Sequence, residues 1–133
     1  MKTKNDIGIL IIRLVIAIPM LMYGITKLFH GIGFIEELLE SYGIPSIVGY
    51  NVYIGEILAP IAIIIGYRTR LASLIFTINC LVALLLTQTQ YIFALNDHGG
   101  WAIEQLAIFS LIPLALYYTG AGKLALSTVN KWD

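Results

Sequence analysis

Four ionisable side chains interrupt the long apolar runs of this sequence: Arg13, Lys27, Glu56 and Glu104. Such a group inside a membrane-spanning segment is costly, and it usually faces the protein interior or a water-filled cavity. The formal charges of these four cancel, so pairing between them would neutralise the set. Together with Asn79, a polar residue of the third apolar run, they form the intramembrane polar cluster that we predict as the candidate site.

The two cations share one face of a predicted first helix. Arg13, Ala17, Met20, Gly24 and Lys27 follow helical spacing, so they form a single stripe. The two charges lie about 21 Å apart along it. The small residues between them would let another helix approach closely.

The two carboxylates lie at a similar depth. Glu56 is about 9 Å below Tyr50, and Glu104 is about 5 Å below Trp101, so both belong to the outer half of the membrane. Lys27 is their nearest cation in depth. Simpler roles remain open: Arg13 and Lys27 extending to the headgroups, Glu104 at the interface, and Glu56 in a purely structural role.

Aromatic residues gather near the same outer interface. Tyr23, Tyr53 and Trp101 are typical of residues that anchor a span at the headgroups. Beside Glu56 and His98, they could also form the walls of a pocket for a quinone headgroup. The two histidines show no metal-ligand spacing, so we predict no metal site. No catalytic or cofactor-binding residues can be assigned from the sequence.

The composition is that of an integral membrane protein. Hydrophobic residues make up 59% of the 133 residues and charged residues 12%, about half of the usual density for a soluble domain. The net charge is zero, so nucleic acid is not an expected partner. The single cysteine, Cys80, excludes an internal disulfide.

Four apolar runs are long enough to cross a bilayer, which requires about 20 residues. They are residues 7–29, 50–67, 71–91 and 101–118. Lipid demands that backbone groups pair within each segment, so we predict one all-α domain over residues 1–133, a four-helix membrane bundle. Arg13 interrupts the first run and no cleavage pattern follows, so we expect a retained span. Prolines at 19, 60 and 113 predict kinks.

The basic residues set the orientation. With four spans, six of them fall on one side, and the acidic residues of the connections fall on the other. The basic set is Lys2, Lys4, Arg68, Arg70, Lys123 and Lys131. Positive residues favour the cytoplasm, so we predict a multi-pass protein of the cell membrane with both termini cytoplasmic.

The first outer connection, residues 31–49, carries a helical pattern of its own. Apolar and polar residues lie on opposite faces, and Gly43 and Pro45 end the pattern. The apolar face comprises Phe34, Ile35, Leu38, Leu39 and Tyr42. We predict a short amphipathic extracytoplasmic helix, which could serve as a structural cap, a lid over a site or a partner surface.

Several short motifs occur in an order that resembles the DoxX family of small four-span membrane proteins. They are Arg13-Leu14, Tyr23-Gly24, Lys27-Leu28-Phe29, Gly43-Ile44-Pro45, Gly55-Glu56, Gly66-Tyr67-Arg68-Thr69-Arg70-Leu71-Ala72, Gly99-Gly100-Trp101, Glu104, Thr119-Gly120-Ala121-Gly122 and Leu126-Ser127. The chain departs from this pattern at Ala59-Pro60, where a glycine-rich continuation is expected. The resemblance implies a link to quinone-linked redox complexes and oxidative stress, but no agreed catalytic residues.

Three functions are compatible with these features. The first is a redox- or quinone-associated accessory subunit of a membrane complex, not a stand-alone enzyme, with quinone as the one cofactor considered. The second is a non-catalytic assembly or scaffold factor for another membrane protein. The third is a small-solute or proton pathway. We expect the bilayer, and either a second copy or a membrane-protein partner, to contact the chain.

Overall fold

The computed structural model describes residues 2–31, 33–87 and 89–133, and their regular structure is helical apart from one isolated bridge between Leu95 and Trp101. The helical elements, in order, are α1 (Lys2–His30), α2 (Gly33–Ser41), the 3-10 turn η1 (Ser46–Tyr50), α3 (Asn51–Tyr53), the π-helical turn η2 (Ile54–Leu58), α4 (Ala59–Ile65), α5 (Thr69–Thr87), the 3-10 turn η3 (Thr89–Tyr91) and α6 (Glu104–Thr119). The all-helical expectation is confirmed for this part of the chain.

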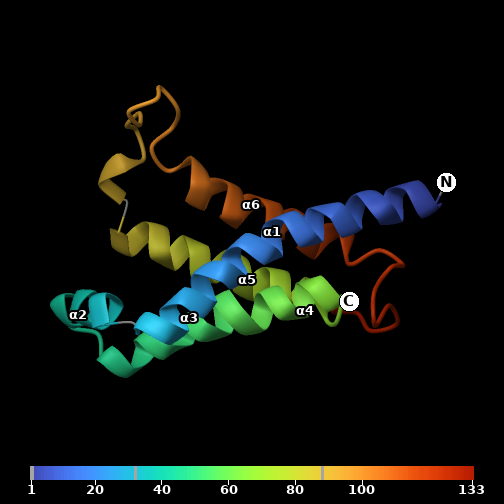
Figure 1. The fold of residues 1–133 in the computed structure, drawn as a ribbon, viewed down its shortest axis with the longest axis horizontal. Coiled ribbons are helices and arrows are strands. Elements are labelled where there is room, and N and C mark those ends of the chain that lie inside the picture. Colours follow the sequence, from blue (N-terminus) through green and yellow to red (C-terminus); the bar gives the residue numbers. More distant parts are fainter. Residues whose placement is uncertain (1, 32, 88) are drawn as a thin grey trace.

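The long helices alternate in direction. α1 and α5 run toward the end of the molecule where α2 lies, whereas α3–α4 and α6 run away from it (Figure 1). α5 packs most extensively on α6, and α1 packs on α4 and η2, while α1 and α6 contact each other much less. The core between them contains Ile16, Ala17, Met20, Ala59, Ile63, Ala72, Phe76, Cys80, Phe109 and Leu116.

The four long helical segments of the bundle are called rods below, and the second rod is composed of several helical elements. The sequence predicts one span over residues 50–67, but the chain there passes from α3 through the π-turn η2 into α4. In η2 the Ala59 amide donates to the Ile54 carbonyl, five residues earlier. Pro60 follows directly and has no amide hydrogen to donate, so it fits at the first turn of α4. The wider turn and the proline together set Glu56 in a locally irregular stretch of helix.

The amphipathic helix between the first two rods is confirmed as α2. Its last turn closes with a hydrogen bond from the Ile44 amide to the Leu39 carbonyl, 2.9 Å, and Gly43 takes a left-handed conformation, φ +77°. Leu39 is buried and Tyr42 is exposed. The side chain of Phe34 lies outside the described part of the structure.

Within the described part of the chain, two helices are long and apolar enough to cross a membrane: residues 4–30 within α1 and residues 69–86 within α5. Residues 54–65 form a shorter apolar helical stretch. Large apolar side chains are exposed along the outer faces of the rods, including Val15, Met22, Leu58, Leu85 and Leu111. A face of this kind suits contact with lipid.

Candidate functional site

Lys27 and Glu56 form a close ion pair. The Lys27 Nζ atom donates to both Glu56 carboxylate oxygens, each at 2.7 Å. Glu56 is 3% exposed, whereas the Lys27 side chain is 34% exposed. The lysine therefore balances a buried carboxylate while part of its own side chain remains accessible.

Two glycines let the surrounding helices approach this pair. A Cβ at Gly24 of α1 would overlap the Glu56 carbonyl oxygen and the Ile57 side chain. A Cβ at Gly55 of η2 would lie only 2.5 Å from Asn79 on α5. Without Cβ atoms at both positions, α1, η2 and α5 can converge at the level of Glu56.

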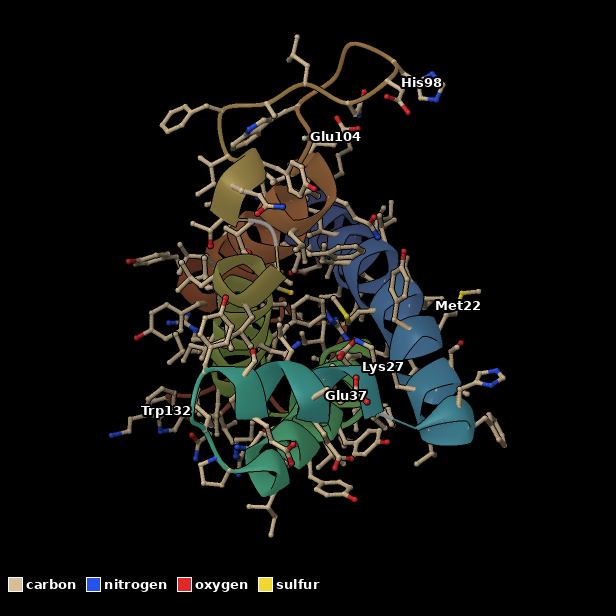
Figure 2. The ribbon with its side chains drawn as sticks, turned by 90° about the vertical axis from the view of Figure 1, so that its left-hand side faces the viewer. Met22, Lys27, Glu37, His98, Glu104 and Trp132 are labelled. Atoms are coloured by element: carbon tan, nitrogen blue, oxygen red, sulfur yellow. The ribbon has the colours of Figure 1, made fainter. Side chains whose placement is uncertain are left out.

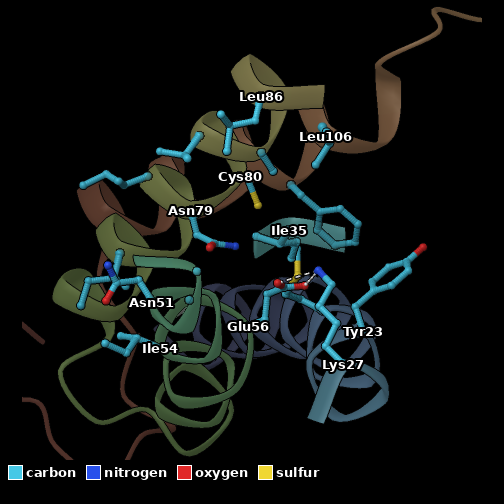
Figure 3. A pocket seen from close by; sticks show the side chains of 18 of the residues that line it. Tyr23, Lys27, Ile35, Asn51, Ile54, Glu56, Asn79, Cys80, Leu86 and Leu106 are labelled. Carbon is cyan, nitrogen blue, oxygen red and sulfur yellow. Dashed lines mark hydrogen bonds and ion pairs between the residues drawn. The ribbon is translucent and has the colours of Figure 1, made fainter. Parts of the chain in front are cut away.

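A cavity of about 590 Å³ lies against the ion pair. This volume falls within the range of small-molecule sites. The side chains of Lys27 and Glu56 meet on one side of it, while Asn79 and Cys80 extend toward them from α5 (Figure 3). Most other lining residues are apolar and include Met20, Ile35, Leu38, Leu39, Ile54, Ile75, Ile78, Val82, Leu86, Leu106 and Phe109.

The short helix α2 contributes to the cavity wall. Ile35, Leu38 and Leu39 all line the cavity, so the apolar face of this helix is directed at the site. The sequence left three roles open for this helix: a structural cap, a lid over a site or a partner surface. Its position against the cavity agrees with a lid. Glu37 and Glu40 on its other face are exposed.

The sequence reasoning missed Gln105. It lines the cavity, and its Nε2 atom donates to the Tyr23 hydroxyl at 2.5 Å, which connects α6 to α1. Gln105 directly follows Glu104, and one residue turns a helix by about 100°, so the two side chains point in different directions. The helical phase of α6 was the one signal that could have distinguished them.

The structure does not bring Glu104, His98 and Trp101 to the cavity. Glu104 begins α6 and is exposed, with Gly100 beside its carboxylate. His98 and Glu104 lie well away from Lys27 when the bundle is seen along its length (Figure 2). Trp101 donates from Nε1 to the Ile92 carbonyl at 2.5 Å. Of the four predicted pocket residues, Tyr23 lines the cavity, whereas Tyr53 is outside its lining and donates from its hydroxyl to the Lys27 carbonyl oxygen at 3.2 Å.

Arg13 is 1% exposed and lies toward the opposite end of the bundle, where it binds backbone instead of a carboxylate. Its guanidinium donates to the carbonyls of Ile63 at 2.9 Å, Ile64 at 2.9 Å, Ala121 at 3.1 Å and Leu124 at 2.7 Å. It therefore joins the end of α4 to the chain that follows α6.

These contacts satisfy carbonyl groups that a helix end leaves unpaired. The last four carbonyls of α4 all find donors: Ala62 from the amides of Gly66 and Tyr67, Ile63 and Ile64 from Arg13, and Ile65 from the amide of Leu126. Arg13 is thus part of the architecture of this end. Between it and Lys27, the buried residues of α1 carry no polar side chain: Ile16, Ala17, Met20 and Gly24.

Within the described residues, no group of three or more His, Cys, Asp or Glu side chains is placed to hold a metal ion. The polar groups that meet at the cavity are a lysine, a carboxylate, amides and a phenol hydroxyl. Such groups can donate to carbonyl oxygens and accept from hydroxyls. The arrangement is therefore suited to an apolar ligand with a small polar ring.

Comparison with known proteins identifies the class. The DoxX family model matches residues 8–89, and the chain belongs to this family of membrane-associated proteins. Over 126 residues it is 26% identical to "Putative oxidoreductase CatD" of Bacillus subtilis (strain 168), an alignment that covers 95% of this chain and 89% of that relative. No solved structure matches the chain significantly.

Proposed function

We propose that this protein binds a quinone in the cavity beside Lys27 and Glu56, as an accessory subunit of a membrane redox complex. The observation that carries the proposal is an ion pair with a buried carboxylate at the wall of a mostly apolar cavity of about 590 Å³. The relative named as an oxidoreductase supports a redox setting. In this proposal the electrons come from another subunit, and the chain supplies the quinone site.

The chemistry of the lining residues favours this ligand class. A quinone presents carbonyl oxygens, which can accept hydrogen bonds from the Lys27 ammonium group and from the Asn79 and Gln105 amides. Its reduced form presents hydroxyl groups, which can donate to the Glu56 carboxylate. The aliphatic side chains around them suit an apolar ring and tail.

The proposal includes a four-span arrangement. α1, the composite segment from α3 to α4, α5 and α6 run in alternating directions (Figure 1). One end of the bundle carries the basic residues Arg68, Arg70 and Lys123. The other end carries α2 with its glutamates. This segregation supports cytoplasmic termini by the positive-inside rule.

Quinone titration of the purified full chain tests the proposal. A short-chain quinone should bind in neutral detergent with a measurable heat in calorimetry. The Glu56→Gln variant should bind the quinone or its reduced form about tenfold more weakly. The reason is that the substitution removes a charged hydrogen-bond partner and leaves the charge of Lys27 unbalanced. Glu104→Gln is the matched control, since this carboxylate is exposed and outside the cavity.

The control should bind like the unmodified protein. If neither redox form binds the unmodified chain, or if the two variants lose binding equally, the proposed quinone site is wrong. Circular dichroism of each variant establishes that the helices are retained, so that a loss of binding is assigned to the site.

A further inference from the structure

A second cavity lies at the opposite end of the bundle from the Lys27–Glu56 pair. Its volume is about 420 Å³, and it is lined by Arg70, Tyr117, Tyr118, Lys131 and Trp132. These residues come from three segments: the start of α5, the end of α6 and the chain that follows α6. Two cations and three aromatic rings therefore share one small hollow.

The wall formed by the last residues is held in place by hydrogen bonds. The amides of Arg70 and Leu71 both donate to the Trp132 carbonyl, at 2.8 and 3.4 Å. The Trp132 amide donates to the Asn130 side-chain oxygen at 2.9 Å, and the Ala121 amide donates to the Asp133 carbonyl at 2.9 Å. These hydrogen bonds hold the segment that contains Trp132 against the start of α5 and the chain after α6.

Gly120 makes room for one of the cations. It has φ +76°, which favours glycine, and a Cβ there would lie 3.1 Å from both Nε and Nη2 of Arg70. The Arg70 side chain therefore lies across the end of α6, close to the tyrosines. Lys131 places its Nζ atom 5.8 Å from the centre of the Trp132 ring, within the range of a cation–π contact.

The carboxylate of Asp133, the residue that follows Trp132, serves other donors. Asp133 accepts from Arg68 Nη1 at 3.0 Å, from the Ser127 hydroxyl at 2.5 Å and from the Asn130 amide at 2.9 Å. Although burial opposes its ionisation, the hydrogen bonds from Ser127, Asn130 and Arg68 prevail and lower the pKa of Asp133 to about 2. Within the described residues, Arg70 and Lys131 have no carboxylate partner. The hollow therefore carries two positive charges that no side-chain ion pair among the described residues balances.

The surface next to the hollow indicates which anion. Tyr118, Leu111 and Ile108 are exposed and spaced by seven and three residues, so they form one apolar strip along α6 that starts at the hollow. A free phosphate would use the cations alone, whereas a phospholipid would use the cations and the strip together. Tyrosine and tryptophan are also common where spans meet headgroups.

We propose that this hollow binds the phosphate of an anionic phospholipid, with the acyl chains lying along the strip of Tyr118, Leu111 and Ile108. The site is separate from the quinone cavity and does not depend on its occupant. Arg70 and Lys131 contact the phosphate, and the aromatic rings flank the glycerol region.

Lipid titration of the full chain in neutral detergent tests this site. Native mass spectrometry should show phosphatidylglycerol binding more tightly than phosphatidylcholine. The double variant Arg70→Gln with Lys131→Gln should weaken phosphatidylglycerol binding by about twenty-five-fold, because each basic residue near an anionic headgroup contributes about fivefold. The control pair Lys4→Gln with Lys123→Gln removes the same charge from residues outside the hollow and should change binding by less than about threefold.

Each other outcome counts against the proposal. Equal losses in the two double variants would mean diffuse attraction to positive charge, and competition by millimolar inorganic phosphate as effective as that by lipid would mean a free-phosphate site. If the Arg70 variant does not fold, Lys131→Gln alone, on an exposed side chain, should still weaken binding by about fivefold. No loss in that variant would also overturn the site.

Discussion

The two cations of the α1 stripe, Arg13 and Lys27, use different partners for different purposes. Lys27 holds one carboxylate at the wall of a cavity, so its charge is balanced by a single side chain. Arg13 has no carboxylate partner among the described residues and distributes its charge over four backbone carbonyls. A guanidinium suits this second task because it presents five donors in a fixed plane.

Arg13→Lys tests this role at the level of one side chain. A lysine has three donors on a flexible stem and cannot reproduce four bonds to two separate segments. We expect a loss of stability of about 3 kcal/mol, because buried carbonyls lose charged donors. Unfolding in mixed detergent micelles, followed by circular dichroism, measures the difference.

Arg70→Lys provides the matched control for that substitution. Arg70 is at the same end of the bundle. In the described part of the structure, its guanidinium donates no hydrogen bond to the protein. This variant should lose less than about 1 kcal/mol in lipid-free detergent. Similar losses for the two variants would show that the carbonyl contacts of Arg13 contribute little.

At the level of helices, the site depends on how closely α1 approaches η2. Ala17 and Gly24 form the small-residue part of the predicted stripe, and Gly24 is where the backbone of η2 lies against α1. This approach determines whether Lys27, one turn further along, reaches the carboxylate of Glu56. Packing of two helices and chemistry of the pair are therefore coupled.

Gly24→Ala and Gly8→Ala form a matched pair within α1. A Cβ at Gly24 meets the Glu56 carbonyl, so this variant should lose roughly 1–3 kcal/mol and bind quinone less tightly. A Cβ at Gly8 has nothing within 4 Å, so that variant should gain up to about 1 kcal/mol from higher helix propensity. Stabilisation by both substitutions, measured in the same unfolding assay, would contradict a tight contact at Gly24.

At the level of the whole molecule, the two ends of the bundle have different tasks. The end near α2 contains the larger cavity and the ion pair, and the other end ties the last residues onto the turn between α4 and α5. Within α1, the buried residues between the two ends are apolar. On α5, however, the hydroxyl groups of Thr69, Ser73 and Thr77 are buried, so a polar path between the two ends stays a prediction.

Labelling of engineered cysteines tests the four-span arrangement. His98→Cys and Lys123→Cys place thiols on exposed residues at opposite ends, while the native Cys80 is buried. In intact cells, a membrane-impermeant maleimide should label position 98, and position 123 should react only after permeabilisation. Labelling of both positions from the same side would contradict a membrane crossing between residues 98 and 123.

The amino-acid sequence by itself determined the local features of this protein. Length, hydropathy and period specify where helices form, and they predicted α2 because its apolar residues recur at helical spacing within a connection. They also identified Lys27 as the cation at the depth of Glu56. The predicted helix boundaries were less accurate, since α6 begins at Glu104. The π-turn before Pro60 was not predicted, because the missing amide hydrogen of a proline does not specify how the chain compensates for it.

Only the tertiary structure decided which distant residues meet. Arg13 contacts Ala121 and Leu124, more than a hundred residues away, and Gln105 instead of Glu104 faces the cavity. Both outcomes depend on the rotation and tilt of packed helices, since a turn of about 100° exchanges one side chain for the next. The hydropathy pattern does not specify that rotation, whereas the close contacts at Gly24 and Gly55 fix it.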